Sequence, residues 1–349
     1  MVEWKKLGEV CLPLSKAIIK QGDLLDNGCY PVINSGVTLY GRYNEYNNEG
    51  NAFTFASRGE YAGFITFLSN PFWAGGLCYP YRSKDENKFI TKYVFQYLKN
   101  KEKYIMDTLV MRGGIPALNK ADVEKIPIPL PSLSEQERIV GILDTFTSSI
   151  ENLKAQISLR RKQYEHYRDK LLDLEGKEGV EMKTLKDVCK LERGIRVVKK
   201  DLQENGVIPV YQNSLTPLGF YERSNFPANT SFVICAGAAG EIGFSDIPFW
   251  AADDCTCMVC PLSINGKYIY HFLITKQHVL KSQVRKASVP RLSKDVIAKL
   301  PIPLPSFQEQ SRIVSILDEF EASIKNLEAQ LEARQKQYEY YRNKLLTFE

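Results

Sequence analysis

The chain has 349 residues, of which 44% are hydrophobic and 25% are charged, and its formal net charge is +5. This composition excludes a disordered chain, and the length predicts roughly two domains rather than a single core. No apolar run reaches the roughly 18 residues of a membrane span, and the N-terminal MVEWKKLGEV lacks an apolar signal-peptide core, so we expect a cytoplasmic protein.

The positive charge is confined to two regions. Residues 1–125 hold 16 lysines and arginines against 13 acidic residues, and residues 183–299 hold 16 against 10. The segments 126–182 and 300–349 are slightly acidic, with 8 against 10 and 6 against 8. A polyanionic partner is therefore expected at the two basic regions.

Both basic regions are rich in Gly, Asn, aromatic and β-branched residues with frequent turn signals, which predicts short strands and a few helices. Three pairs of strings relate the regions faintly. They are CYPVINSG (29–36) and IPVYQNSL (208–215), NPFWA (70–74) and IPFWA (247–251), and IPALNK (115–120) and VPRLSK (289–294). Two regions that share a scaffold but differ in the sequence between the shared strings suit two recognition modules that bind different targets.

A proline-rich string follows each basic region, IPIPLP from Ile126 and LPIPLP from Leu300. Proline removes a backbone donor and restricts the residue before it, so both strings are expected to be extended. A helix start follows each string, because Ser132 and Ser306 precede a glutamate by three residues, the spacing of a capping box.

A long helix is predicted after each start, and the two are copies. Roughly 31 of 47 positions from Ile126 onward are identical to those from Leu300 onward. The apolar positions alternate in steps of four and three, a heptad pattern, so we expect a coiled coil within the chain, with helices of about 60 Å. The seam positions are Ile139, Leu143, Phe146, Ile150, Leu153, Ile157 and Arg160 in the first copy, and Ile313, Leu317, Phe320, Ile324, Leu327, Leu331 and Arg334 in the second.

The arginine in each seam predicts the direction of packing. Parallel helices in register would place Arg160 beside Arg334, which is unfavourable for two cations. Antiparallel helices would place each arginine near the phenylalanine of the other copy, where a guanidinium can lie on the ring and reach water. We therefore expect an antiparallel pair; separate packing of each helix on its own domain is the alternative.

These repeated strings, with the helix ends RKQYEHYRDKLL and RQKQYEYYRNKLL, resemble the specificity subunit of type I restriction-modification systems. The paired PFWA strings and the P-x-L-[NS]-K strings fit as well, and the resemblance covers essentially the whole chain. It implies an α+β chain with two pseudo-repeated mixed α/β target-recognition domains separated by two long antiparallel coiled-coil helices. The expected boundaries are 1–131 and 176–305 for the recognition domains, and 132–175 and 306–349 for the spacer helices.

The resemblance implies a function in DNA recognition without catalysis. Each recognition domain would read one half of a bipartite site in double-stranded DNA, while the helices set the spacing and dock two methyltransferase (modification) subunits. Restriction subunits would join the complex. S-adenosylmethionine, Mg and ATP would belong to these partner subunits, and this chain would bind no cofactor. The alternative is a stand-alone duplicated nucleic-acid-binding or scaffold protein without a methyltransferase partner.

Candidate DNA contacts come from basic and amide side chains in the two regions, because Arg and Lys bind phosphates and Arg, Lys, Asn and Gln read base edges. For each single residue, a solvated surface charge is the alternative. The candidates are Arg42, Tyr43, Asn44, Arg58, Arg82, Lys84, Arg112 and Lys120 in the first region, and Arg193, Arg196, Lys199, Lys200, Arg223, Asn225, Arg285, Lys286, Arg291 and Lys294 in the second.

Local strings that suggest chemistry are weak. The string NPFW at Asn70 echoes an adenine methyltransferase motif, but Ile247 replaces the asparagine in the second copy, and the glycine string 237–243 lacks a βαβ context. Tight turns and a packed aromatic corner explain both strings better. We expect no catalytic residue and no metal site: DDCTCMVCP favours a buried strand with reduced thiols over zinc, and the three histidines favour packing or surface roles.

Overall fold

The computed structural model describes residues 2–198, 200, 202–203 and 205–348. It divides into two compact units: unit 1 is Met1–Lys154 with Gln330–Glu349, and unit 2 is Ala155–Ala329. Two long helices, α5 (Leu133–Leu172) and α10 (Phe307–Leu345), each contribute one part to each unit. No helix in the described ranges has both the length and the apolar character needed to cross a membrane.

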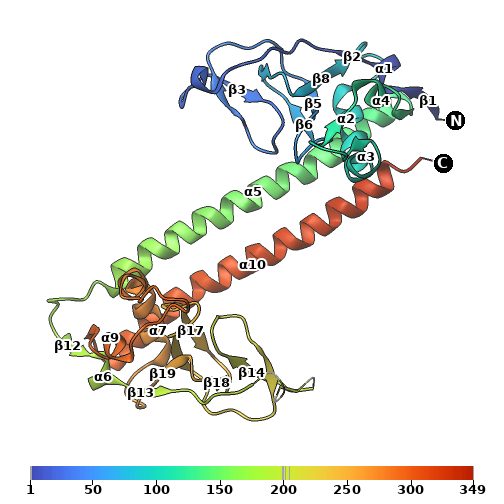
Figure 1. Ribbon diagram of the computed structural model, residues 1–349. Coiled ribbons are helices and arrows are strands. Elements are labelled where there is room, and N and C mark those ends of the chain that lie inside the picture. The colour runs from blue at the N-terminus through green and yellow to red at the C-terminus, as the bar shows by residue number, and fades with distance from the viewer. Residues whose placement is uncertain (1, 199, 201, 204, 349) are drawn as a thin grey trace. The chain divides into compact units, whose positions relative to one another are not determined.

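Unit 1 is built around a four-stranded sheet, a three-stranded sheet and two strand pairs (Figure 1). The four-stranded sheet has the order β2 (Cys11–Pro13), β8 (Cys78–Ser83), β5 (Ala52–Ala56), β6 (Ile65–Leu68), and the three-stranded sheet has the order β4 (Gly41–Tyr43), β3 (Tyr30–Ile33), β7 (Trp73–Ala74). The pairs are β1 (Glu3–Lys6) with β11 (Pro127–Leu130), and β9 (Val110–Met111) with β10 (Ala117–Leu118). The helical segments are α1 (Leu7–Val10), η1 (Gln21–Asp23), α2 (Thr91–Asn100), α3 (Glu102–Thr108) and α4 (Lys120–Glu124).

Unit 2 repeats this plan. Its four-stranded sheet has the order β13 (Lys190–Arg193), β19 (Cys255–Val259), β16 (Thr230–Ile234), β17 (Ile242–Ser245), and its three-stranded sheet has the order β15 (Gly219–Tyr221), β14 (Ile208–Tyr211), β18 (Trp250–Ala251). The remaining pair is β12 (Glu181–Thr184) with β20 (Pro301–Leu304). The helices are α6 (Leu185–Val188), α7 (Gly266–Thr275), α8 (Gln277–Ser282) and α9 (Lys294–Ala298). The structure therefore confirms the α+β class and the duplicated domain.

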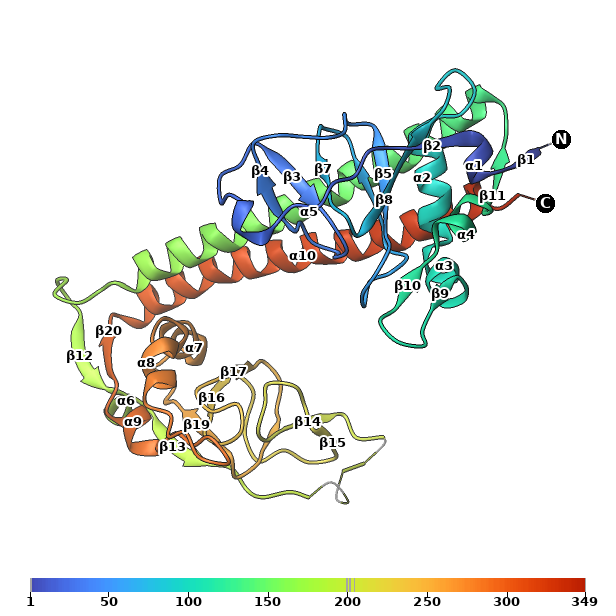
Figure 2. The ribbon, with the colours of Figure 1, turned by 45° about the horizontal axis from the view of Figure 1, so that its top comes forward.

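In each unit one helix covers the four-stranded sheet: α2 packs on β5 and β6, and α7 packs on β16 and β17 (Figure 2). The PFWA strings lie at equivalent places, where Phe72 and Phe249 are fully buried before strands β7 and β18. Strand β7 pairs in parallel with β3, and β18 pairs in parallel with β14. These strings are packed corners of the fold, as the sequence predicts.

The proline-rich strings are extended in both units. Strand β11 pairs with β1 and β20 pairs with β12, both antiparallel. The carbonyl of Pro129 accepts a hydrogen bond from the buried Tyr93 hydroxyl at 2.8 Å, and that of Pro303 accepts one from Tyr268 at 2.6 Å. Each proline strand is thus tied both to a neighbouring strand and to the helix that covers the main sheet.

The starts of α5 and α10 correct one detail of the sequence analysis. Ser132 Oγ accepts a hydrogen bond from the Glu135 backbone N–H, as expected at an N-cap, and Ser306 does the same for Glu309. The expected return contact of a capping box is replaced, because the Glu135 carboxylate takes two hydrogen bonds from Arg138. A bidentate arginine three residues ahead competes successfully for the carboxylate.

The cysteines correct a second expectation. Cys255 and Cys257 are buried in β19, which confirms the buried strand. Cys260, however, forms a disulfide with Cys189, with their Cα atoms 4.5 Å apart. The antiparallel register of β13 with β19 pairs Lys190 with Val259, so the next residues outward face each other. The expectation that every thiol is reduced is therefore wrong for this pair.

The long helices are antiparallel within each unit. In unit 1 the Arg334 guanidinium lies over the Phe146 ring, 5.6 Å from its centroid, and in unit 2 Arg160 lies over Phe320 at 5.7 Å. The seam leucines nearest each recognition domain, Leu143 and Leu317, are fully buried. Both predicted arginine–phenylalanine contacts are confirmed.

Candidate nucleic-acid interface

A buried glutamine joins each recognition domain to the start of its long helix. Gln136 accepts a hydrogen bond from the Ile90 backbone N–H and donates to the carbonyls of Lys88 and Pro131, at 2.9 to 3.0 Å. Gln310 accepts from the Asn265 backbone N–H and donates to the Pro305 carbonyl, both at 3.0 Å. Sequence reasoning missed both glutamines, although their repetition in the two strings after the prolines was a usable signal.

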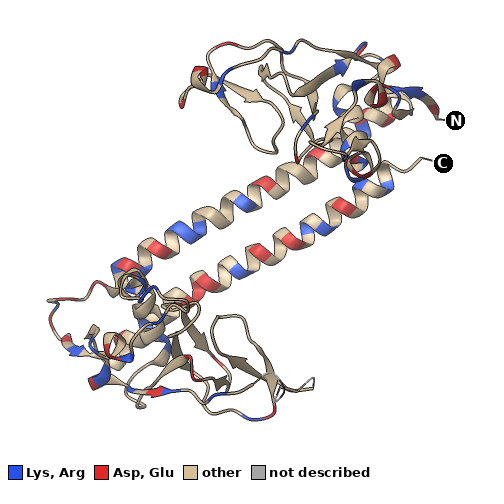
Figure 3. Ribbon diagram, viewed as in Figure 1, with Lys and Arg blue, Asp and Glu red and all other residues tan. Residues whose placement is uncertain are grey.

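An ion pair reinforces each joint. Lys92 of α2 pairs with Asp144 of α5 at 2.7 Å, and Lys267 of α7 pairs with Asp318 of α10 at 2.7 Å. The glutamine and the ion pair together hold α2 against α5 in unit 1 and α7 against α10 in unit 2. Within each unit, the sheets and loops of the recognition domain therefore have a defined orientation relative to the long helix. Along α5 and α10 themselves, basic and acidic residues are interspersed (Figure 3).

Many of the predicted DNA contacts have structural partners within their own unit. Arginine and lysine side chains donate to backbone carbonyls in most of these cases. The contacts are Arg42 to Gly28 and Cys29, Arg82 to Glu49 and Gly50, Lys84 to Gly8, Arg112 to Met106, and Arg193 to Asp253. In addition, Asn44 accepts from the Cys29 N–H and Lys120 pairs with Glu124 at 3.6 Å.

Other predicted contacts are exposed and unengaged. Within the described ranges, these basic side chains make no hydrogen bond or ion pair: Arg58, Arg196, Lys200, Arg285, Lys286, Arg291 and Lys294. Lys199 lies outside the described residues. Free cationic side chains are the ones that can bind phosphates or base edges without breaking contacts of the fold.

Free arginines lie at one edge of each domain, which we name the hairpin edge (residues 57–59 and 110–118 in unit 1; 235–237 and 285–292 in unit 2). They are Arg58 in unit 1 and Arg285 and Arg291 in unit 2. In unit 1 the backbone of Arg58 forms an isolated antiparallel β-bridge with Ala117, and in unit 2 the backbone of Ala236 forms one with Arg291. The arginine therefore sits at the same backbone bridge in both units, but on opposite strands of it. Gly59 and Gly237 make the adjacent turn with φ of 90° and 82°, a conformation that glycine adopts readily.

A second feature is the aromatic corner, made by Tyr43, Trp73 and Asn47 in unit 1 and by Tyr221, Trp250 and Asn225 in unit 2. Trp250 is buried and the other five residues are partly buried. In each unit the tyrosine and tryptophan rings are edge to face, with centroids 5.3 and 5.1 Å apart. The asparagine amide exchanges two hydrogen bonds with the backbone of Ala74 or Ala251, so Asn225 is engaged in the frame.

Comparison with known proteins identifies the family. A model of the type I restriction modification DNA specificity domain matches residues 1–160 and again residues 177–334. The chain belongs to this family. The specificity subunit of the Escherichia coli type I restriction enzyme EcoR124I/EcoR124II is 30% identical to it, over 99% of this chain and 94% of that protein. A putative type I specificity subunit of Haemophilus influenzae, S.HindORF215P, is 29% identical over 99% of this chain and 96% of its own length.

Solved structures share the fold of this specificity subunit. The S subunit of a type I restriction-modification system from M. genitalium has a TM-score of 0.77 at 20% identity, covering 100% of this chain and 97% of its own. A chain from a study of complex assembly and conformational transition in the type I R-M system has a TM-score of 0.58 at 17% identity, covering 99% and 97%. The two matches to the specificity-domain model and the 30% identity to the Escherichia coli protein make the present chain a specificity subunit with two recognition domains.

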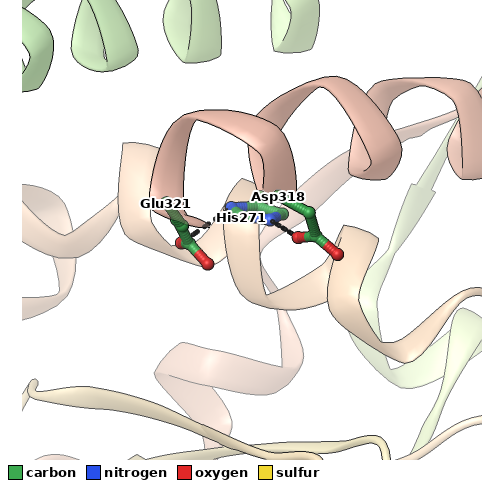
Figure 4. Close-up of side chains that lie close together, drawn as sticks. All are labelled: His271, Asp318 and Glu321. Atoms are coloured by element: carbon green, nitrogen blue, oxygen red, sulfur yellow. Dashed lines mark ion pairs between the residues drawn. The ribbon is translucent and has the colours of Figure 1, made fainter. Parts of the chain in front are cut away.

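The specificity subunit also has a polar cluster in unit 2, where the buried His271 lies between the partly exposed Asp318 and Glu321 (Figure 4). Its Nε2 is 3.5 Å from Asp318 and its Nδ1 is 3.9 Å from Glu321, and the Tyr164 hydroxyl is 3.2 Å from Nδ1. A single metal ion would use one ring nitrogen, whereas here the two carboxylates face different nitrogens. The ammonium of Lys267 also lies 2.7 Å from Asp318 and 3.5 Å from Glu321, where it supplies the positive charge.

Burial controls the protonation of this cluster. It lowers the pKa of His271 to about 4, despite the opposing effect of Asp318, so the imidazole is neutral at neutral pH. Burial also acts to lower the pKa of Lys267, but its bonds to Asp318 and Glu321 raise it overall. The cluster is therefore a structural link between α7, α5 and α10, in agreement with the packing role expected for this histidine.

Proposed function

We propose that this specificity subunit reads a bipartite DNA site, one half with each recognition domain. The observation that carries the proposal is the hairpin edge, which places a free arginine at one backbone bridge in both units but surrounds it with different residues. Two copies of one frame with different exposed side chains are suited to two different half-sites. The net positive charge of both recognition regions supports the same partner.

The two long helices would set the spacing of the half-sites and dock two modification subunits. Restriction subunits would complete the complex. S-adenosylmethionine, Mg and ATP would then be bound by those partners, and the specificity subunit would have no catalysis of its own. The duplicated spacer helices, with their antiparallel seam and mixed surface charge, support a scaffold of this kind. A bacterial complex of this type would act in the cytoplasm.

The test is to map methylated adenines across a genome in cells with the modification subunits, with and without this chain. The expected result is a methylated bipartite sequence that depends on the chain. Arg58→Ala and Arg291→Ala should each relax one half of that sequence, and the two halves should differ. Methylation that is independent of the chain, or a single variant that relaxes both halves, would refute the proposal.

A further inference from the structure

The aromatic corner offers a second place where the two units differ on a constant frame. Besides the tyrosine and asparagine contacts, each tryptophan indole donates to a backbone carbonyl: Trp73 to Ala17 at 3.1 Å and Trp250 to Ile195 at 2.9 Å. The backbone and rings of the corner are therefore held in the same way in both units. What differs is the exposed side chain two residues after the tyrosine.

In unit 2 this residue is Arg223, and it is held by the corner. Its guanidinium carbon lies 5.3 Å from the Tyr221 ring centroid and 5.6 Å from that of Trp250. Its Nη2 donates to the Tyr221 hydroxyl at 3.0 Å. The guanidinium is thus restrained on two rings, which reduces the conformational entropy that it would lose on binding a ligand.

Most donors of Arg223 are nevertheless unused. A guanidinium carries five N–H donors, and within the described chain only the bond to Tyr221 is made and no carboxylate pairs with the group. This distinguishes it from Arg42 and Arg193, whose donors are directed to carbonyls of their own loops. An exposed, oriented and unpaired guanidinium is suited to a ligand with two adjacent acceptors.

In unit 1 the equivalent residue is Glu45, which is also exposed. The equivalence is fixed by the frame, because Glu45 lies two residues after Tyr43 and two before Asn47, as Arg223 lies between Tyr221 and Asn225. A carboxylate accepts hydrogen bonds and donates none, so it presents the opposite chemistry at the same place. If this position served only to stabilise the aromatic corner, the same corner in the two units would not be expected to carry side chains of opposite charge.

We propose that the aromatic corner is a base-reading position and that Arg223 reads a guanine through its O6 and N7 atoms. The inference rests on the proposed function and assigns one base of the second recognition domain's half-site. Arginine is the side chain that most often makes this bidentate contact in the major groove, and glutamate instead accepts from the cytosine amine. Trp250 and Tyr221 act as positioning residues. In the first recognition domain, Glu45 excludes guanine from the equivalent place.

The experiment uses the full chain assembled with its modification subunits and selects bound sequences from a random DNA library. For Arg223→Ala we expect one guanine position in one half-site to become degenerate, with a loss of roughly 10- to 100-fold in preference for guanine there. Arg223→Lys should lose part of this preference, because an ammonium can still donate to O6 and N7 but lacks the planar fork that directs two parallel donors. Arg223→Glu should shift the preference toward cytosine.

Two controls separate reading from folding. Arg161→Ala removes an exposed arginine of α5 that pairs with Glu328, and it should leave the selected sequence unchanged. Thermal unfolding of Arg223→Lys should match the wild type. A uniform loss of affinity for all sequences, or an unchanged guanine preference in Arg223→Ala and Arg223→Lys, would overturn the inference. If the wild-type complex itself selects no bipartite sequence, the proposed function fails independently of these variants.

Discussion

Arg160 of α5 lies over the ring of Phe320 of α10, with its guanidinium carbon 5.7 Å from the ring centroid. Phe320 also stacks on Tyr167, at a centroid distance of 5.4 Å and an interplanar angle of 26°. The cation in the seam therefore lies over an aromatic ring of the other helix rather than beside another cation. The same contact between Arg334 and Phe146 in unit 1 shows that it belongs to the repeat.

Removing this contact should weaken helix pairing in unit 2. We expect Arg160→Ala to lower the free energy of unfolding by about 1 kcal/mol, because both the cation–π contact and the packing of the arginine stem are lost. Chemical denaturation measures the change. Lys162→Ala, two residues away on an exposed position of α5, is the matched control and should have little effect. Equal losses in both variants would contradict a specific role for the seam arginine.

The buried histidine predicts a pH dependence of stability. The His271 pKa in the folded chain is lowered to about 4 from 6.5, so the unfolded chain takes up the proton first as the pH falls. Stability should be unaffected by this group above pH 6.5 and should decrease between pH 6.5 and 4. The maximum loss is about 3 kcal/mol for this shift.

The first unit supplies the matched substitution for this test. Gln96 of α2 occupies the place of His271, next to the ion pair of Lys92 with Asp144. In His271→Gln the part of the pH dependence due to the imidazole should vanish. Identical stability–pH profiles for wild type and variant would show that the imidazole does not titrate on unfolding.

The disulfide predicts a thiol count and a stability difference. With Cys189 and Cys260 joined, six of the eight cysteines should react with a thiol reagent in denaturant without reductant. The bond closes a loop with a sequence separation of 71, for which the chain-entropy estimate is about 4 kcal/mol. Cys189→Ser should remove that stabilisation. A count of eight reactive thiols would show that the bond does not form under the conditions used.

The role proposed for the helices predicts the effect of a paired deletion. Removing residues 151–157 together with residues 325–331 takes one heptad from each helix and keeps the seam positions matched. Seven residues correspond to about 10 Å of helix, or roughly three base pairs of DNA. The half-site spacing in selected DNA should shorten by about that amount, with both half-sites unchanged. An unaltered spacing in a folded, DNA-binding variant would refute the proposal.

The repeated segments were predictable because their physics is local. The heptad spacing predicts which residues form the seam, and the seam arginines Arg160 and Arg334 predict its antiparallel direction. Neither prediction needs the structure of a recognition domain. The disulfide was not predictable, since it depends on which strand pairs with β13 and in what register. Gln136 was missed because its partners, the backbone of residues 88 and 90, are distant in sequence.

The candidate interface was predictable only as a set of regions. Arg42 and Arg223 lie in the same kind of turn-rich sequence. Arg42 donates to carbonyls of its own loop, whereas Arg223 lies over two rings and donates only to the Tyr221 hydroxyl within the described chain. That difference arises from the positions of backbone carbonyls and tryptophan rings, which composition and spacing do not encode. Charge clusters identify the domain surface, and the tertiary contacts identify the available side chains.

The buried glutamines Gln136 and Gln310 have a consequence for engineering. Each binds its recognition domain through main-chain groups, so the joint does not depend on which side chains the domain carries there. In unit 2, for example, a foreign recognition domain could therefore be inserted between the end of α5 and strand β20. Its backbone would need to present the same amide and carbonyl groups to the glutamine. Modular exchange of specificities would then require compatible main-chain geometry at the graft point, with no redesign of the helices.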